Sequence, residues 1–568
     1  MLTRLRADFV FLCAVGVLYV TDVLNVTEAF AGFVSTPVLI TGSMCIVVAG
    51  LSYTGVLQWV TAHVLGQPKK PRQIFMRLTL PVAVMSSFIV NDTVVMFFVG
   101  VVKMWAKKLS MSPSRLLIPM AYASGMGGAL LIMATTSGLV VSGLYAEKTG
   151  HPLNIFEPSL PALTCLIGGM LVVFVLRRLL PDNKSSEALF DKTNEYTVEL
   201  LVTSNNPHIG ETVGALGLNK VSAGSLVEMI HFDNDRVLSP VNDDEPLMGG
   251  DRLVFAGQIE DLVKLAEEMD FVSTDYPVFS VNEEEEERNF SIAYVRFGSS
   301  LIDTRLARTT FEKDNQMTLV AVSRQGERIE QPPREVVLRA GDSLLFASPA
   351  HKKIDKAALK HDLQFFDIAK ITNKGQSPIV SAAILMAMVI LIATGTVPLL
   401  QGAFVAAAAM FLFKCCSPTQ GMESIDWSLL INVAGGITLG AALQKTGVAE
   451  QMAMGMLGIC GDNPLVVMIA VCLVTAVVTE FISNTATAAL MFPIMYNAVV
   501  DIQGNLLPFT IALLLSANSA FMTPFSNTLN LMVYGPGGYS ATDYLRIGLP
   551  VKLTYLTIAI SMVFLLYF

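Results

Sequence analysis

Two short stretches place polar side chains inside apolar sequence. FIVNDTVV (88–95) carries Asn91 and Asp92 within an apolar run from about 78 to 102, and FISNTATA (481–488) carries Asn484 at the same distance from its Phe-Ile start. Asparagine and hydroxyl side chains supply neutral oxygens and N–H donors, which bind a small ion without adding net charge. An ionisable residue such as Asp92 at membrane depth predicts a functional site. These residues suggest ion binding, provided that the chain is a membrane protein.

The composition indicates a polytopic α-helical membrane protein. Of the 568 residues, 53% are hydrophobic and 15% are charged, and the mean hydropathy is +0.56, whereas soluble domains carry about 25% charged residues. The first apolar run predicts an uncleaved span rather than a signal peptide. Several runs reach the roughly 20 residues that cross a bilayer: 9–26, 37–56, 160–176, 379–392 with its extension, and 549–568.

Basic residues predict the orientation. Segments 61–77 and 103–115 are rich in Lys and Arg, whereas 23–35 has neither. The N-terminus and residues 181–375 are therefore expected in the cytoplasm of a bacterial cell, with 75–110 entering and leaving the inner membrane on one side. We expect about nine spans and two re-entrant hairpins, with residue 568 outside the cell. The hairpins are predicted at 75–109 and 462–500.

The middle of the chain, residues 181–375, has the composition of a soluble insertion, and it repeats. PLMGGDRLVFAG (246–257) recurs as VLRAGDSLLFAS (337–348). The Gly-Asp pair common to both predicts a turn between short strands in each copy.

The repeat predicts two small α/β domains at 194–270 and 290–366, joined by a linker with the acidic run 283–287. They resemble the C-terminal domains of regulators of potassium conductance. That resemblance implies either a structural, dimerising appendage or a site for a small regulatory ligand.

The two membrane halves, 1–180 and 376–568, also repeat. Asn91 matches Asn484 at an offset of 393 residues, and Ser86 matches Thr479 at the same offset. Each half has a long helix ending in Thr-Gly, then a hairpin, then an interrupted helix. The fold class that follows is two inverted repeats, each with a re-entrant hairpin and a broken helix. The interrupted helices are expected at 130–140 and 519–530.

Broken helices at corresponding positions of two repeats indicate the binding site of a secondary transporter. Non-helical backbone at membrane depth persists where it is buried in protein or lines a cavity. Its carbonyls can coordinate a cation there, and the N-termini of the half-helices favour an anion. The alternative is that the polar residues only cap kinked helices or hold helices together.

At this point the chain resembles the divalent anion/sodium symporters of the ion transporter superfamily, in the subgroup with paired potassium-conductance regulator domains. The resemblance covers essentially the whole chain. It implies a Ser-Asn-Thr tripeptide at each hairpin tip, two sodium sites, and an anion site between them. The matching segments are AFAGFVSTPVLI (29–40), SPSRLLIPMAYAS (112–124), IDWSLLINVAGGITLGAALQKTGVA (425–449), TEFISNTATAALMFPI (479–494) and YGPGGYSATDYLRIGLP (534–550).

Two sets of residues follow from this resemblance. The residues expected at the anion are Asn91, Asp92, Thr93, Thr136, Ser137, Ser483, Asn484, Thr485, Pro524 and Asn530. The residues expected at sodium are Ser86, Asn91, Asp92, Ala134, Thr479, Asn484 and Ala520.

The first half departs from the family pattern. Its tripeptide is Val90-Asn91-Asp92, and Gly138 stands where the family commonly has Asn. The chain also begins near the family's third span, which implies that two leading helices are absent. A carboxylate at the anion site repels a dianion unless it is protonated or neutralised by a cation. Asn-Asp also occurs at this hairpin in relatives that export arsenite, so the substrate class and coupling ion stay open.

The expected function is cation-coupled symport of a small anion, such as sulfate or a dicarboxylate, by alternating access. Na⁺ is the expected coupling ion, with H⁺ as the other possibility. The alternatives are a cation/proton antiporter or oxyanion exporter in the same fold, and a non-transporting sensor. We expect a homodimer in the lipid bilayer, with no nucleic acid partner, no cofactor and no enzymatic activity. The chain shows no nucleophile–base set, and GPGGY (535–539) indicates a turn rather than a phosphate-binding loop.

Overall fold

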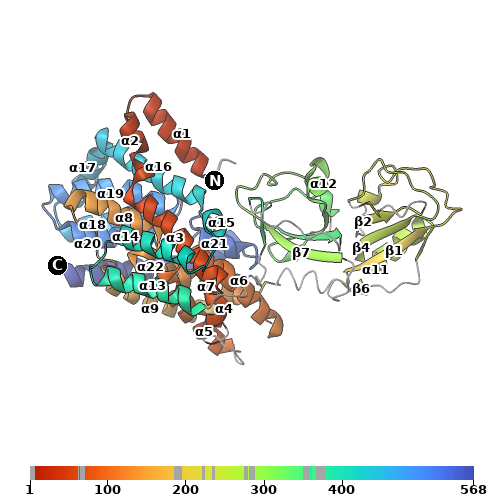
Figure 1. Ribbon diagram of the computed structural model, residues 1–568, viewed down its shortest axis with the longest axis horizontal. Coiled ribbons are helices and arrows are strands. Elements are labelled where there is room, and N and C mark those ends of the chain that lie inside the picture. The colour runs from red at the N-terminus through yellow and green to blue at the C-terminus, as the bar shows by residue number, and fades with distance from the viewer. Residues whose placement is uncertain are drawn as a thin grey trace.

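The computed structural model describes residues 7–61, 63, 71–109, 111–183, 195–220, 224–232, 237–238, 240–273, 279–280, 288–329, 331–349, 359, 361–365 and 378–568. A body of packed helices lies at one end, and two β-sheets follow one another away from it (Figure 1). The predicted acidic linker at 283–287 lies outside the described residues.

The first half of the helical body contains a helix hairpin, α5 and α6, followed by α7 and an interrupted helix that ends in α8. The described helices are α1 (Ala7–Val20), α2 (Val26–Ala31), α3 (Thr36–Tyr53), α4 (Val56–Val60), α5 (Pro71–Phe88), α6 (Asn91–Lys108), α7 (Ser114–Gly128), α8 (Thr136–Thr149) and α9 (Ser159–Leu176), with a 3-10 turn, η3 (Ile132–Ala134), before α8.

The second half repeats this order. Its hairpin is α18 and α19, and α20, α21 and α22 follow as α7, α8 and α9 do in the first half. The described helices are α13 (Pro378–Ala393), α14 (Leu399–Leu412), α15 (Pro418–Glu423), α16 (Trp427–Lys445), α17 (Val448–Cys460), α18 (Pro464–Val478), α19 (Asn484–Asp501), α20 (Leu506–Ala517), α21 (Thr528–Tyr534) and α22 (Ala541–Tyr567).

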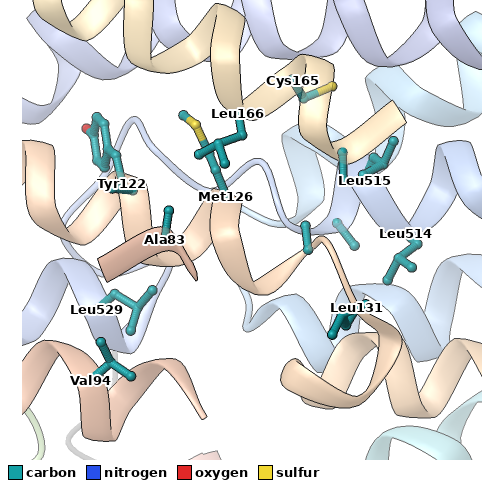
Figure 2. Packing of buried hydrophobic residues seen from close by; sticks show 14 of the residues in the cluster. Ala83, Val94, Tyr122, Met126, Leu131, Cys165, Leu166, Leu514, Leu515 and Leu529 are labelled. Carbon is teal, nitrogen blue, oxygen red and sulfur yellow. The ribbon is translucent and has the colours of Figure 1, made fainter. Parts of the chain in front are cut away.

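The halves share one hydrophobic core. α9 packs along α22, and α8 packs against α19. Figure 2 shows Val94 of α6 beside Leu529 of α21, with Tyr122 and Met126 of α7 in the same core. Four described segments are long and apolar enough to cross a membrane: Val26–Tyr53, Ser159–Leu179, Trp427–Lys445 and Ala541–Tyr567.

The two sheets have the same strand order. The first, β3-β2-β4-β1-β5 with β6 on β1, matches the second, β9-β8-β10-β7-β11, strand for strand. Every pairing is antiparallel, with Leu200 opposite Leu253 in the first sheet and Ala293 opposite Leu344 in the second. The first sheet is built from β1 (Glu195–Val202), β2 (Gly224–Ile230), β3 (Val237–Leu238), β4 (Arg252–Gln258), β5 (Phe271–Ser273) and β6 (Phe279–Ser280). The second is built from β7 (Arg288–Val295), β8 (Thr318–Arg324), β9 (Glu327–Arg328), β10 (Ser343–Pro349) and β11 (Leu363–Phe365).

The predicted Gly-Asp turns are present in both sheets. Gly250 and Gly341 have φ of 94° and 85°, in the left-handed region that favours glycine. Asp251 and Asp342 then accept from the backbone N–H three residues earlier, at 2.8 Å in each case. The first sheet also includes β5 and β6, which lie beyond residue 270.

The second sheet contacts the helical body directly. Lys103 of α6 donates through Nζ to the Tyr294 hydroxyl of β7 at 2.7 Å, and its side chain is buried. The Phe297 ring packs on Phe525 and Tyr534, with ring centroids 5.0 and 5.9 Å apart. Sheet and hairpin helix are therefore fixed to each other.

Candidate ion-binding site

The two hairpin tips differ in how the second helix of each hairpin begins. In the second hairpin Ser483 caps α19, because its Oγ accepts from the Ala486 N–H at 3.3 Å. Val90 takes the same place before α6 and has no side-chain oxygen to accept from the backbone N–H groups. A side-chain N-cap stabilises a helix start by about 1 kcal/mol. The second tip is thus better fixed by its own sequence than the first.

The predicted upstream hydroxyls tie each hairpin to the helix that follows it. Ser86 Oγ lies 2.7 Å from Ser124 Oγ on α7. Thr479 Oγ1 lies 2.7 Å from the carbonyl oxygen of Ala517 at the end of α20 and 3.0 Å from Asn484 Oδ1. Both hydroxyls are buried. They occupy equivalent positions, since Ser124 and Ala517 are also 393 residues apart (517 − 124).

Asn91 lies against the backbone of α7 at Gly128. A Cβ on residue 128 would lie only 2.5 Å from Asn91 Oδ1, so a larger residue there would displace the Asn91 carboxamide. Among the described residues, the buried Asn91 Oδ1 has no hydrogen-bond partner. An unsatisfied buried acceptor is costly, and a cation bound to this oxygen would satisfy it.

The first interrupted helix explains the departure at position 138. The chain leaves α7, makes the short turn η3 that contains the buried Ala134, and enters α8 with Thr135 as its cap, whose Oγ1 accepts from the Gly138 N–H at 3.2 Å. A Cβ at Gly138 would lie 2.5 Å from the Ile132 carbonyl oxygen. The family's Asn therefore does not fit this backbone.

In the second interrupted helix, the non-helical residues 518–527 join α20 to α21. Asn530 of α21 reaches back and donates through Nδ2 to the carbonyls of Ala520 and Thr523, at 3.1 and 3.0 Å. Ser137 of the first half donates to Asn518 Oδ1 at 2.8 Å.

Each hairpin tip contacts the broken helix of the other half. Thr485 lies at the second tip, and its hydroxyl is 2.6 Å from that of Thr136, the first residue of α8. Asp92 lies at the first tip and accepts from the Thr528 hydroxyl, at the first residue of α21, at 2.7 Å. The two contacts are equivalent, because Thr485 and Asp92 are 393 residues apart (485 − 92) and Thr528 and Thr136 are 392 apart (528 − 136).

The contacts above involve the predicted residues or their direct neighbours in the sequence, with two exceptions. Thr93 is half-buried in the first turn of α6 and Pro524 is buried in the unwound segment, but neither takes part in the polar contacts described above. The start of α6 also carries the carboxyl group of Asp92, and both the Asp426 carboxylate before α16 and the Arg296 guanidinium after β7 lie within electrostatic range of it.

Sequence reasoning missed four polar residues that these contacts include: Ser124, Asn518, Asn527 and Thr528. Asn527 caps α21 by accepting from the Leu529 N–H at 3.2 Å. Asn527 and Thr528 form an Asn-Thr dipeptide directly before an apolar run, which is a common signal for the start of a helix and could have identified both residues. Ser124 and Asn518 have no comparable local signal.

Comparisons with known proteins identify the family of this chain. The family model described as citrate transporter matches residues 1–506 and 456–568. The chain belongs to the citrate transporter family. An uncharacterized transporter of Synechocystis is 28% identical to this family member, over 97% of this chain and 92% of its own length. The probable sodium/sulfate cotransporter 3 of Chlamydomonas reinhardtii is 22% identical, over 94% and 83%.

This family member also aligns with the crystal structure of the YdaH transporter of Alcanivorax borkumensis, at a TM-score of 0.45 and 11% identity over 95% of this chain and 86% of that one. Similarity at this level carries no detail of the site. The family match and the apolar helices show an integral membrane transporter and not an enzyme. The predicted resemblance to sodium-coupled anion symporters is confirmed at the level of the family, whereas the subgroup with potassium-conductance regulator domains stays a prediction.

Proposed function

We propose that the protein is a sodium-coupled symporter that imports a small dianion, such as sulfate or a dicarboxylate, by alternating access. The observation that carries the proposal is the pair of equivalent contacts between each hairpin tip and the opposite broken helix, Asp92–Thr528 and Thr485–Thr136. They join the start of α6 to the start of α21 and the start of α19 to the start of α8, so each contact links the two halves. The family's description as citrate transporters and the sodium/sulfate cotransporter among the relatives support this substrate class.

The cations would bind at the tips. Asn91 and Asn484 are the first residues of α6 and α19, and each carries a carboxamide oxygen. The upstream hydroxyl of Thr479 lies 3.0 Å from Asn484 Oδ1, and that of Ser86 pairs with Ser124 on α7. The backbone carbonyls near Ala134 and Ala520 provide further oxygens. Neutral oxygens suit a monovalent cation that has to be released again in each cycle.

The anion would bind between the tips, where Ser483, Thr485 and Thr136 offer hydroxyls and the N-termini of α8 and α19 face the same region. Asp92 imposes an order on the binding of the cation and the anion. Two like charges at contact distance repel strongly at low dielectric, so the dianion is admitted only after a cation has neutralised Asp92. Cation binding before anion binding is the consequence.

Movement between inward-facing and outward-facing states would involve the two halves as inverted repeats, with the hairpins re-entrant as predicted. The second sheet is bound to α6 through Lys103 and Tyr294 and to α21 through Phe297 and Tyr534. On the predicted orientation both sheets lie in the cytoplasm, where a homodimer contact or a small regulatory ligand would act on the same helices.

Proton-linked antiport or oxyanion export is the second candidate, and Asp92 is the observation that favours it. A carboxylate at a tip can exchange a proton as well as neutralise a cation. The two functions predict different driving gradients, an inward Na⁺ gradient for symport and an inward H⁺ gradient for export.

The experiment is transport by the purified full-length protein in proteoliposomes. Uptake of labelled sulfate, succinate, citrate and arsenite is measured with an inward Na⁺ gradient, with K⁺ in its place, and with a pH gradient alone, and Asn484→Ala serves as the inactive control. Symport predicts uptake of at least one dianion with Na⁺ only. Anion movement driven by the pH gradient and indifferent to Na⁺ would overturn the proposal in favour of the second candidate.

A further inference from the structure

A buried carboxylate lies directly beside the candidate site, one residue after Thr479. Glu480 Oε1 accepts from the backbone N–H groups of Phe521 and Met522 at 3.2 and 3.1 Å, and Oε2 accepts from the N–H of Thr523 at 3.1 Å. Only 8% of Glu480 is exposed. One side chain of the second hairpin thus binds three consecutive N–H groups of the unwound segment.

Lys552 of α22 completes this arrangement. Its Nζ lies 2.6 Å from Glu480 Oε1 and 2.5 Å from the Ala476 carbonyl oxygen, and the residue is 5% exposed. A buried carboxylate is tolerated when it is paired and hydrogen-bonded. The ammonium cancels the charge, so the pair adds no net field against an anion in the site.

The segment that Glu480 holds is also fixed from its other side. The Ala520 and Thr523 carbonyls accept from Asn530 Nδ2, and the Phe521 carbonyl accepts from the buried Tyr122 hydroxyl at 2.6 Å. The N–H groups of residues 521–523 therefore point to Glu480 while the neighbouring carbonyls point to groups around the site. This arrangement sets the direction of the Ala520 carbonyl, one of the oxygens expected at the cation.

The equivalent position in the first half carries no carboxylate. Ser87 takes the position of Glu480 (480 − 87 = 393), and its hydroxyl lies 3.0 Å from the Ala83 carbonyl oxygen and 3.1 Å from that of Gly127. The corresponding segment there closes through its own 3-10 turn and the Thr135 cap. At this position of the described chain, a buried carboxylate paired with a lysine is therefore a feature of the second half.

We propose that Glu480 and Lys552 are positioning residues that hold the unwound backbone at 520–523 in the conformation that binds the coupling cation. This inference rests on the proposed function for its cation. Three unpaired N–H groups would let the segment rotate, and the Ala520 carbonyl would lose its direction even in a folded protein.

The test compares the full-length wild type with Glu480→Gln/Lys552→Met, in which both buried charges are removed together. The matched control is Glu28→Gln/Lys445→Met, which removes the half-exposed ion pair between α2 and α16, 2.5 Å in length. Two quantities are measured: the shift of the thermal midpoint with Na⁺ against K⁺, which gives an apparent Kd for Na⁺, and amide hydrogen exchange in peptides covering 517–527.

The expected result is a rise of about tenfold or more in the apparent Kd for Na⁺ in the Glu480/Lys552 variant, with faster exchange at 521–523. The control should keep both values. Glu480→Asp provides a second variant should the double variant not fold, because it keeps the charge pair but shortens the side chain by one methylene. It should also raise the apparent Kd for Na⁺ and speed amide exchange at 521–523. A folded variant with wild-type exchange and wild-type Na⁺ affinity would overturn the inference.

The two proposals fail separately. A wild type without any Na⁺-specific shift contradicts sodium coupling, whereas unchanged amide exchange at 521–523 in the variants contradicts the positioning role whichever ion is transported.

Discussion

The two hairpin tips share a geometry but differ in charge and in how they are held. At both, an Asn begins the second helix, a hydroxyl five residues upstream joins the hairpin to the next helix, and the residue after the Asn contacts the opposite broken helix. The second tip has the cap of Ser483 and the buried Glu480–Lys552 pair beside it. The first has Val90 and the carboxylate of Asp92.

This difference shows which features the fold requires and which are free to change. The Asn, the upstream hydroxyl and the contact with the opposite broken helix occur in both halves. The Ser483 cap, the Glu480–Lys552 pair and the carboxylate of Asp92 each occur at one tip, so the first tip carries an acidic side chain while the carboxylate beside the second is paired with a lysine. We infer that the first tip senses the coupling ion and that the second provides a neutral oxygen site.

The largest effect is expected from removing the two Asn side chains. Asn91→Ala and Asn484→Ala should each lower sodium-driven uptake by at least about a hundredfold, since an oxygen bound to a charged group contributes up to about 3 kcal/mol. The fold should persist, because the carboxamides line a site rather than a packed core. Uptake in proteoliposomes and the thermal midpoint in detergent check this. An active Asn91→Ala beside an inactive Asn484→Ala would break the equivalence of the tips.

Next in size is the charge at the first tip. Asp92→Asn should raise the half-saturating Na⁺ concentration by about tenfold at both acid and neutral pH, because a neutral amide attracts the cation less than a carboxylate does. The measurement is the Na⁺ dependence of uptake at two pH values. A variant with normal Na⁺ dependence but no pH dependence would assign Asp92 to proton transfer instead.

The contacts between each hairpin tip and the opposite broken helix, Asp92–Thr528 and Thr485–Thr136, allow a sharper comparison of the tips. Thr528→Val removes a hydrogen bond to a carboxylate and should lower uptake by roughly tenfold, whereas Thr136→Val removes a neutral pair and should lower it by roughly threefold, because charge-assisted bonds are about twice as strong. A double-mutant cycle of each with its partner, Asp92→Asn or Thr485→Val, isolates the pair. Equal couplings would show that the charge of Asp92 makes no difference to the contact.

The smallest effect concerns the cap. Val90→Ser gives the first tip the hydroxyl that Ser483 supplies to the second, and it should raise stability by up to about 1 kcal/mol, while Ser483→Ala should lower it by a similar amount. Both are read from the denaturation midpoint in detergent, with transport as the control. A stability loss in Val90→Ser would mean that apolar packing around Val90 outweighs the cap.

Much of the architecture could be predicted from the sequence. Short stretches of sequence are enough to recognise the matching polar residues 393 positions apart, the hydroxyl-to-Asn spacing, and the turns at Gly250 and Gly341. The insertion is recognised from its composition. The structure has helices, tips, turns and sheets at these places. The reason is that hydropathy, helix capping and turn formation depend on neighbouring residues. The hairpin topology in the membrane, the dimer and the regulatory ligand stay predictions.

The partners across the site were decided only by tertiary structure. Asp92 and Thr528 are 436 residues apart, and Glu480 and Lys552 are 72 apart, and nothing in the neighbouring sequence of either residue specifies the other. The sequence shows Gly138 as a departure from the family pattern. The reason for the glycine is the nearby carbonyl oxygen of Ile132 in the preceding turn, which leaves no room for a Cβ. The sequence determined where the helices are interrupted and backbone groups are left without helical partners. The packing of the two halves determined which side chains satisfy it, because a buried polar group accepts whichever partner the fold brings within hydrogen-bond distance.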